Sequence, residues 1–118
     1  MSQLLALALA AVTTLAAADV TGNWKGTLTP DGRDSGPALL VLKQEGKTVT
    51  GTVGPDEGER HPISKGTVEN DTVAFEVETP GGVMRFALKQ NGDELTGDVT
   101  RERDGQQQTA KLAVKRTP

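Results

Sequence analysis

The sequence predicts an all-β domain in which eight antiparallel strands follow one another as an up-and-down meander and close into a barrel. Apolar and polar residues alternate along most of the chain after residue 18, with the period of two that half-buried strands require. Short turns rich in Gly, Asn and Pro separate the alternating segments, and no segment in this part has apolar residues at helical spacing. Closure into a barrel would hide both edges of such a meander. A two-sheet β-sandwich produces the same alternation and is the alternative architecture.

The first 18 residues have the composition of a signal peptide. Residues Leu4–Ala18 are apolar and uncharged, and they end in Ala16–Ala18, which fits a signal-peptidase site. The apolar run is short for a membrane span. Met1–Gln3 lacks the basic residue that usually begins a signal peptide. An uncleaved N-terminal anchor is the alternative. We expect cleavage before Asp19, a single barrel domain over residues 19–118, and no integral membrane segment after cleavage.

The expected strands are recognised by their alternation and by the turn residues at their ends. The first strand contains Trp24, and a loop rich in Pro, Gly and Ser follows it at residues 30–37. Short turns join the later strands in pairs. The eight expected strands are residues 23–29, 38–44, 47–53, 62–69, 72–79, 82–90, 93–101 and 107–115.

Five two-residue turns test this assignment, because the register of a hairpin decides which residues share a face. The turns are Glu45-Gly46, Asn70-Asp71, Pro80-Gly81, Asn91-Gly92 and Gly105-Gln106. Each turn places apolar residues of its two strands opposite one another. The expected pairs are Leu42 with Val49, Val68 with Val73, Phe75 with Phe86, Leu88 with Leu95, and Val99 with Leu112. All five hairpins therefore agree on one apolar face.

This apolar face predicts the barrel interior. The three aromatic residues of the chain, Trp24, Phe75 and Phe86, belong to it and form the expected structural core. The other inward-facing apolar residues are Leu28, Leu40, Leu42, Val49, Val53, Val68, Val73, Val77, Met84, Leu88, Leu95, Val99, Leu112 and Val114. Three glycines share this parity, Gly26, Gly51 and Gly97, and they either let the strands coil tightly or leave room inside.

Charge and composition narrow the classes of function. The net charge of −3 is small and of mixed sign, which does not favour binding to nucleic acids or anionic membranes. The chain has no Cys and one His, so it offers neither disulfides nor a typical transition-metal ligand set. We expect no cofactor and no metal site.

A twelve-residue segment occurs twice, at residues 42–53 and 88–99, with seven identical positions at an offset of 46. This internal repeat predicts the same hairpin in each half of the chain. Its turns fall at one end of the meander, together with both termini. The longer connections, residues 30–37, 54–61 and 102–106, fall at the other end. Because function usually lies on the longer loops of a rigid scaffold, we expect the binding site at that end.

The long-loop end collects many charged residues, and the strand pattern points Arg101 inward at its mouth. The candidate ligand-binding residues are Arg33, His61, Arg101 and Arg103.

Catalysis has little support in the sequence. His61 is the only His, and no Gly-x-Ser-x-Gly motif accompanies it. Asp56, Glu57 and Glu59 lie on one loop, with no second carboxylate placed opposite them. We therefore expect no enzyme and no catalytic residues; a hydrolase that uses these loop carboxylates is the alternative.

Several apolar residues point away from the predicted interior. Leu39, Val41, Val83 and Ala87 would form a modest apolar patch if they cluster, and such a patch predicts a weak dimer. Scattered surface apolar residues are the alternative interpretation.

Two short segments resemble the calycin superfamily, which includes lipocalins and avidins. Residues 20–27, VTGNWKGT, resemble its Gly-x-Trp first strand, and residues 46–53, GKTVTGTV, are similar to the second hairpin of avidin-like barrels. The resemblance implies that Trp24 plugs the closed end and that a ligand enters at the open end. The Trp and Tyr residues of the avidin biotin site, the lipocalin Thr-Asp-Tyr motif and the C-terminal helix of lipocalins are absent, so it extends to architecture and not to the ligand.

The expected function is a non-enzymatic binding module outside the cytoplasm, secreted or periplasmic, in a bacterium. It would bind a small ligand or a protein partner at the long-loop end. The alternative is a structural or interaction domain with a packed core and no small-molecule ligand.

Overall fold

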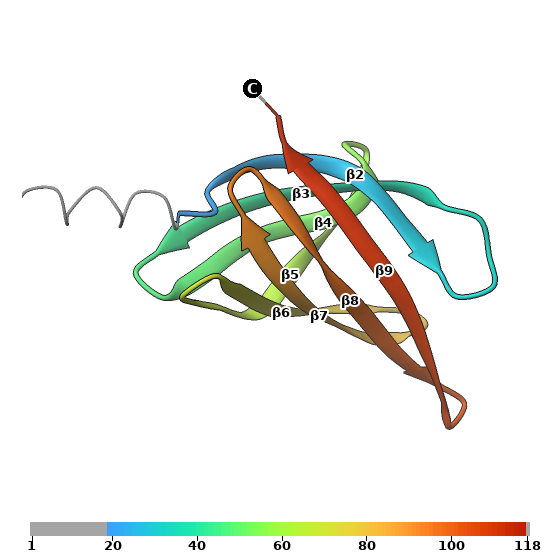
Figure 1. Cartoon of the computed structure of the whole chain (residues 1–118). Coiled ribbons are helices and arrows are strands. Elements are labelled where there is room, and N and C mark those ends of the chain that lie inside the picture. Colours follow the sequence, from blue (N-terminus) through green and yellow to red (C-terminus); the bar gives the residue numbers. More distant parts are fainter. Residues whose placement is uncertain (1–18, 118) are drawn as a thin grey trace, which may run out of the picture.

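The computed structural model describes residues 19–117, which form a closed barrel of eight antiparallel strands (Figure 1). The strands are β2 (Gly22–Pro30), β3 (Gly36–Glu45), β4 (Thr48–Asp56), β5 (Glu59–Glu69), β6 (Thr72–Thr79), β7 (Gly82–Asn91), β8 (Glu94–Arg103) and β9 (Gln106–Arg116). Each strand pairs with the next along the chain, and β9 pairs with β2 to close the barrel. The predicted up-and-down barrel is therefore confirmed, and the sandwich is excluded.

The predicted signal peptide, residues 1–18, lies outside the described residues. Within residues 19–117, no helix has the length and apolar character needed to cross a membrane.

The strand registers confirm two of the five predicted turns and displace three. In β5–β6 and β6–β7, Val68 lies opposite Val73 and Phe75 lies opposite Phe86, as predicted. In β3–β4, β7–β8 and β8–β9, each residue has a partner two positions away from the predicted one. Because two residues are one full period of a strand, this displacement leaves the predicted faces unchanged.

Backbone conformation explains the displaced turns. Gly46 and Gly92 have φ angles of 63° and 64°, and each takes the first position of its two-residue turn, where a positive φ is needed. In the β8–β9 turn both Asp104 and Gly105 have positive φ angles, 53° and 78°, the combination that Asp-Gly hairpin turns adopt. The chain therefore turns where glycine permits it.

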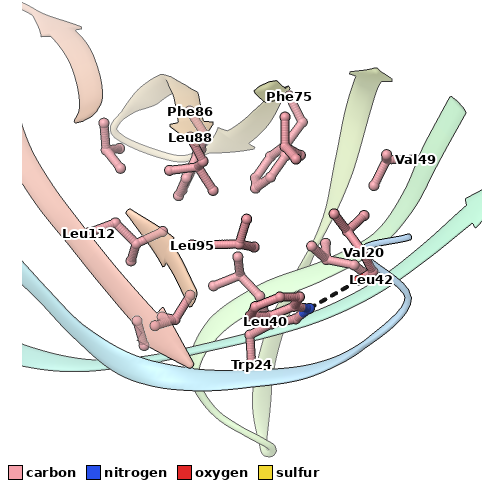
Figure 2. Packing of buried hydrophobic residues seen from close by; sticks show 14 of the residues in the cluster. Val20, Trp24, Leu40, Leu42, Val49, Phe75, Phe86, Leu88, Leu95 and Leu112 are labelled. Carbon is pink, nitrogen blue, oxygen red and sulfur yellow. Dashed lines mark hydrogen bonds between the residues drawn. The ribbon is translucent and has the colours of Figure 1, made fainter. Parts of the chain in front are cut away.

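The barrel interior is the hydrophobic core that the alternation predicts. Every apolar residue of the predicted inward set is buried or packs against buried core residues. Figure 2 shows their side chains converging from strands on all sides, and the stacked rings of Phe75 and Phe86 have centroids 4.6 Å apart. The core also contains Val20, Ala38 and Ala110, which the prediction did not include.

Trp24 closes the barrel near the two repeated turns. Its side chain is fully buried, and its Nε1 donates a hydrogen bond of 3.0 Å to the Val20 carbonyl oxygen (Figure 2). The Arg116 guanidinium lies over the indole ring, 4.4 Å from its centroid. Trp24 therefore forms a plug at the closed end, with an apolar side facing the core and a cation on its other side.

Arg116 also holds the start of the described chain against this plug. Its guanidinium donates hydrogen bonds to the carbonyl oxygens of Thr21 and Asp19 and to Asp93 Oδ1 at 3.0 Å. Hydrogen bonds from Thr21 hold the pKa of the Asp19 carboxyl below its usual value. One side chain from the last strand thus fixes the segment that precedes the first.

Replacing Arg116 with glutamine is expected to lower the free energy of unfolding by about 2 kcal/mol, because the variant loses the cation–π contact and several charge-assisted hydrogen bonds. Urea unfolding followed by Trp24 fluorescence measures the change. Lys115→Gln is the matched control, since Lys115 is exposed and has only a 3.7 Å ion pair with Glu94. The control should change stability by less than about 0.5 kcal/mol. Equal effects of the two variants would refute this role for Arg116.

The outer face of the barrel does not carry the predicted apolar patch. Leu39 and Val41 lie on β3, whereas Val83 and Ala87 lie on β7, and three strands separate β3 from β7 in either direction around the barrel. Leu39 is also only 5% exposed. The prediction of one dimer surface formed by these four residues is wrong, because barrel closure places the two strands on opposite sides.

The open end of the barrel has shorter connections than predicted. Only the β2–β3 connection, residues 31–35, is a longer loop, because β4 and β5 continue to a two-residue turn at Glu57-Gly58. The segments 54–61 and 102–106 are therefore mostly strand, and their prediction as long loops is wrong. The backbones of these segments remain paired as antiparallel strands, so both hairpins extend past the core.

The β8–β9 hairpin projects beyond the end of its neighbour β2 (Figure 1). The pairing of β2 with β9 ends where Pro30 lies opposite Ala110, followed by one hydrogen bond of 3.0 Å from the Asp31 amide to the Thr109 carbonyl oxygen. The inner face of this projecting hairpin forms one wall of the open end.

Candidate functional site

An apolar pocket of about 210 Å³ lies at the open end of the barrel interior. Its floor and walls include Leu28, Val53, Val77, Met84, Phe86 and Leu112. Leu28, Val53 and Met84 are the members of the predicted inward set that are only partly buried. The barrel is therefore filled at its closed end and left open above this layer.

The β4–β5 pair shapes one side of the pocket. Its register is irregular between Val53 and Asp56, so Val53 lies opposite His61 and Asp56 lies opposite Glu59. This pairing puts His61 on the same face as Val53, and the imidazole lines the pocket. His61 thus lies on a strand and faces the interior, whereas the sequence places it in a loop.

Few polar groups face this pocket. The His61 side chain is 34% exposed, and its Nε2 lies 3.5 Å from Glu59 Oε2. Thr79 also lines the pocket, and its hydroxyl donates a hydrogen bond of 2.8 Å to the Gly82 carbonyl oxygen. Because the Thr79 hydroxyl donates its hydrogen to Gly82, His61 is the principal polar residue of an otherwise apolar lining.

A second, polar pocket of about 330 Å³ lies against the projecting β8–β9 hairpin. It is lined by Pro30, Asp31, Arg33, Arg101, Gln107, Gln108 and Thr109. Arg101 Nη2 donates a hydrogen bond of 2.9 Å to Gln108 Oε1. Arg33 comes from the β2–β3 loop, so this pocket joins two separate parts of the open end.

The four predicted ligand-binding residues therefore do not form one cluster. Arg33 and Arg101 line the polar pocket, and His61 lines the apolar pocket. The side chain of Arg103, at the end of β8, lies outside what the structure describes. The two pockets share no lining residue, but both belong to the predicted end of the barrel.

The acidic residues of the β4–β5 turn have a local structural role. Asp56 Oδ1 accepts hydrogen bonds from the backbone amides of Gly58 and Glu59, at 2.8 and 3.0 Å. Asp56, Glu57 and Glu59 are all exposed. Across the residues that the structure describes, no group of three or more His, Asp or Glu side chains is arranged to hold a metal ion.

Sequence reasoning missed several residues of these pockets. Met84 and Leu28 belong to the predicted core but also line the apolar pocket. Their position near the open end of their strands is a signal that could have indicated this. Gln108 shares its inward parity with Ala110 and Leu112, and the two-residue displacement of the β8–β9 register does not change that parity. Ala38 lies next to the β2–β3 loop and carried no such signal.

Comparisons with protein-family models, with curated proteins and with solved structures give no match to this chain.

Proposed function

We propose that this protein is a non-enzymatic binding module of the calycin type that acts outside the cytoplasm of a bacterium and holds a small ligand at its open end. The observation that carries the proposal is the apolar pocket above Val77, Phe86 and Leu112. Small-molecule sites are typically concave and apolar with a few polar groups, and this pocket has that character. The calycin kinship and the export rest on the sequence resemblance and on the apolar N-terminal segment.

The size of the pocket limits the ligand. Its volume of about 210 Å³ lies below the range of roughly 300–1,000 Å³ that is common for drug-sized ligands. An apolar cavity of about 150 Å³ holds one benzene-sized molecule. The pocket therefore accommodates a single ring or a short hydrocarbon chain, with the remainder of the ligand outside the barrel.

The lining favours binding over catalysis. An apolar wall binds hydrocarbon by removing it from water, at about 25 cal/mol per Å² of buried surface. Nucleophilic catalysis would need His61 beside a nucleophile and an orienting group. Its one ion-pair neighbour among the described residues is the exposed Glu59. The module is therefore proposed to hold its ligand without transforming it.

A neutral probe tests the proposed function. Octan-1-ol should shift the NMR signal of the Met84 ε-methyl group in a saturable manner, because Met84 lines the pocket and is the only Met after residue 1. Val53→Trp should weaken binding by at least about tenfold, since its indole would occupy the mouth. Val41→Trp is the matched control on the outer face of β3, and its affinity should equal that of the wild type.

Two outcomes would count against the proposal. Absence of a saturable Met84 shift would leave the alternative, a structural or interaction domain with a packed core and no small ligand. Equal binding by Val53→Trp and the wild type would mean that octanol binds elsewhere. Far-UV circular dichroism would verify that both variants are folded.

A further inference from the structure

The two pockets share strands, and several of their lining residues are neighbouring inward positions of the same strand. On β2, Leu28 lines the apolar pocket and Pro30, two residues further along, lines the polar one. On β9, Leu112 and Gln108 are divided in the same way, with the buried Ala110 between them. Two residues of a strand span about 7 Å, so the polar layer lies just outside the apolar layer.

The β7–β8 pair gives the most direct link between the layers. Met84 of the apolar pocket lies directly opposite Arg101 of the polar pocket in the strand register. Directly opposed residues on one face have Cβ atoms about 4.5–5.5 Å apart. Met84 and Arg101 therefore place one residue of the apolar pocket directly beside one residue of the polar pocket.

The guanidinium groups of the polar pocket lack the carboxylate partners that Arg85 and Arg116 have. Arg85 and Arg116 each lie within ion-pair distance of a carboxylate. Among the described residues no carboxylate lies within that distance of Arg33 or Arg101, and the one hydrogen bond of the Arg101 guanidinium in this part goes to the neutral Gln108 amide. Their charges are therefore available to an external anion.

Space beside Arg101 favours such a contact. Gly81 adjoins the guanidinium, and a Cβ at that position would lie 3.4 Å from Arg101 Nη1. Glycine thus adds no side chain beside Nη1, while Nη2 is held by Gln108. A planar guanidinium with a fixed orientation matches the geometry of a carboxylate or another oxyanion. Asp31 lines the same pocket and is the one acid of its lining, against two arginines.

We infer that the ligand of this barrel is a short amphipathic anion, whose apolar body enters the mouth pocket and whose oxyanion head group binds Arg101 and Arg33. This inference rests on the proposed function, because it assigns the chemistry of the ligand at the same open end. It excludes a cationic head group, which the two arginines would repel. The volume of the apolar pocket restricts the body to a ring or a short chain.

Three probes with the same hydrocarbon chain separate this inference from the proposed function. Octanoate, octan-1-ol and octylammonium are titrated into the protein at pH 7 and followed through the Met84 methyl signal. Octanoate should bind at least about tenfold more tightly than octan-1-ol, and octylammonium more weakly than either. The ratio of octanoate to octanol affinity should fall as salt is added, because the exposed charges are screened.

Substitutions identify the residues responsible. Arg101→Gln, and separately Arg33→Gln, should lower the ratio of octanoate to octanol affinity to about one. Arg85→Gln is the matched control, because Arg85 follows Met84 in β7 but lies on the outer face, 63% exposed. The control should keep the wild-type ratio. Trp24 fluorescence during urea unfolding would report whether each variant remains folded.

The outcomes are distinguishable. Saturable binding of octan-1-ol with no preference for octanoate overturns the anion inference and leaves the proposed function intact. A preference for octanoate that survives both arginine substitutions also overturns it. Absence of binding by all three probes overturns the proposed function, and the inference with it.

Discussion

Replacing Trp24 with alanine is expected to lower the free energy of unfolding by about 3–5 kcal/mol, the cost of truncating a large buried aromatic side chain. The indole is fully buried among the strands of the closed end. Its Nε1 satisfies the Val20 carbonyl oxygen, and its outer side lies against Arg116. Alanine would leave a cavity, an unpartnered carbonyl group and a guanidinium without its aromatic contact.

Urea unfolding followed by far-UV circular dichroism measures this loss, since Trp24 is the only Trp and its fluorescence disappears with it. Lys25→Ala is the matched control on the adjacent, exposed position and should change stability by less than about 0.5 kcal/mol. Trp24→Phe should fall between the two, because it restores part of the packing and no hydrogen bond. A loss below about 1 kcal/mol for Trp24→Ala would contradict the burial of the indole.

The barrel could be predicted from the sequence because its main signal is local. Alternation with a period of two assigns every residue to a face, and an error of two residues in register does not change that face. Leu42 was expected opposite Val49 and lies opposite Gly51, yet both partners face the interior. The predicted fold is therefore correct, although the predicted residue pairs in three hairpins are not.

The role of Arg116 could not be predicted in the same way. Its partners Thr21 and Asp19 lie 95 and 97 positions away in the sequence, and no local pattern connects them. They meet only because closure of the barrel brings β9 beside β2. Pairwise contacts across the closing seam depend on the completed fold and not on hydrophobic alternation.

The candidate site could be predicted as a region but not as an arrangement. Parity correctly placed Arg101 at the mouth, since it continues the inward series of β8 after Val99. His61 could not be placed, because a register irregularity in β4–β5 decides its neighbour and such irregularities leave little trace in the alternation. The separation into an apolar and a polar layer depends on side-chain volumes that a binary pattern omits.

The repeated hairpin carries the second large expected effect. Gly51 of the first copy lies opposite Leu42, and Gly97 of the second lies opposite Leu88. A Cβ atom at Gly97 would overlap the carbonyl oxygen of Ala87, and one at Gly51 would overlap the carbonyl oxygen of Val41. Of the two roles open to the inward glycines, the geometry favours close approach of the strands over empty space inside.

Gly97→Ala and Gly51→Ala are each expected to lower the free energy of unfolding by about 3 kcal/mol, because the added methyl group forces paired strands apart. The effect should be larger at Gly51, whose φ angle of 144° is also unfavourable for a side chain. Urea unfolding followed by Trp24 fluorescence measures both.

Gly36→Ala provides the control for these two substitutions. Gly36 also lies in a strand, but a Cβ there meets no heavy atom within 4 Å and its φ angle is not positive. Its substitution should change stability by less than about 0.5 kcal/mol. If Gly97→Ala behaved like Gly36→Ala, β7 and β8 could not approach as closely as described. Close packing of the repeated hairpins would then no longer explain why the apolar pocket of the interior lies at the mouth, and the assignment of the ligand to that end would lose its structural basis.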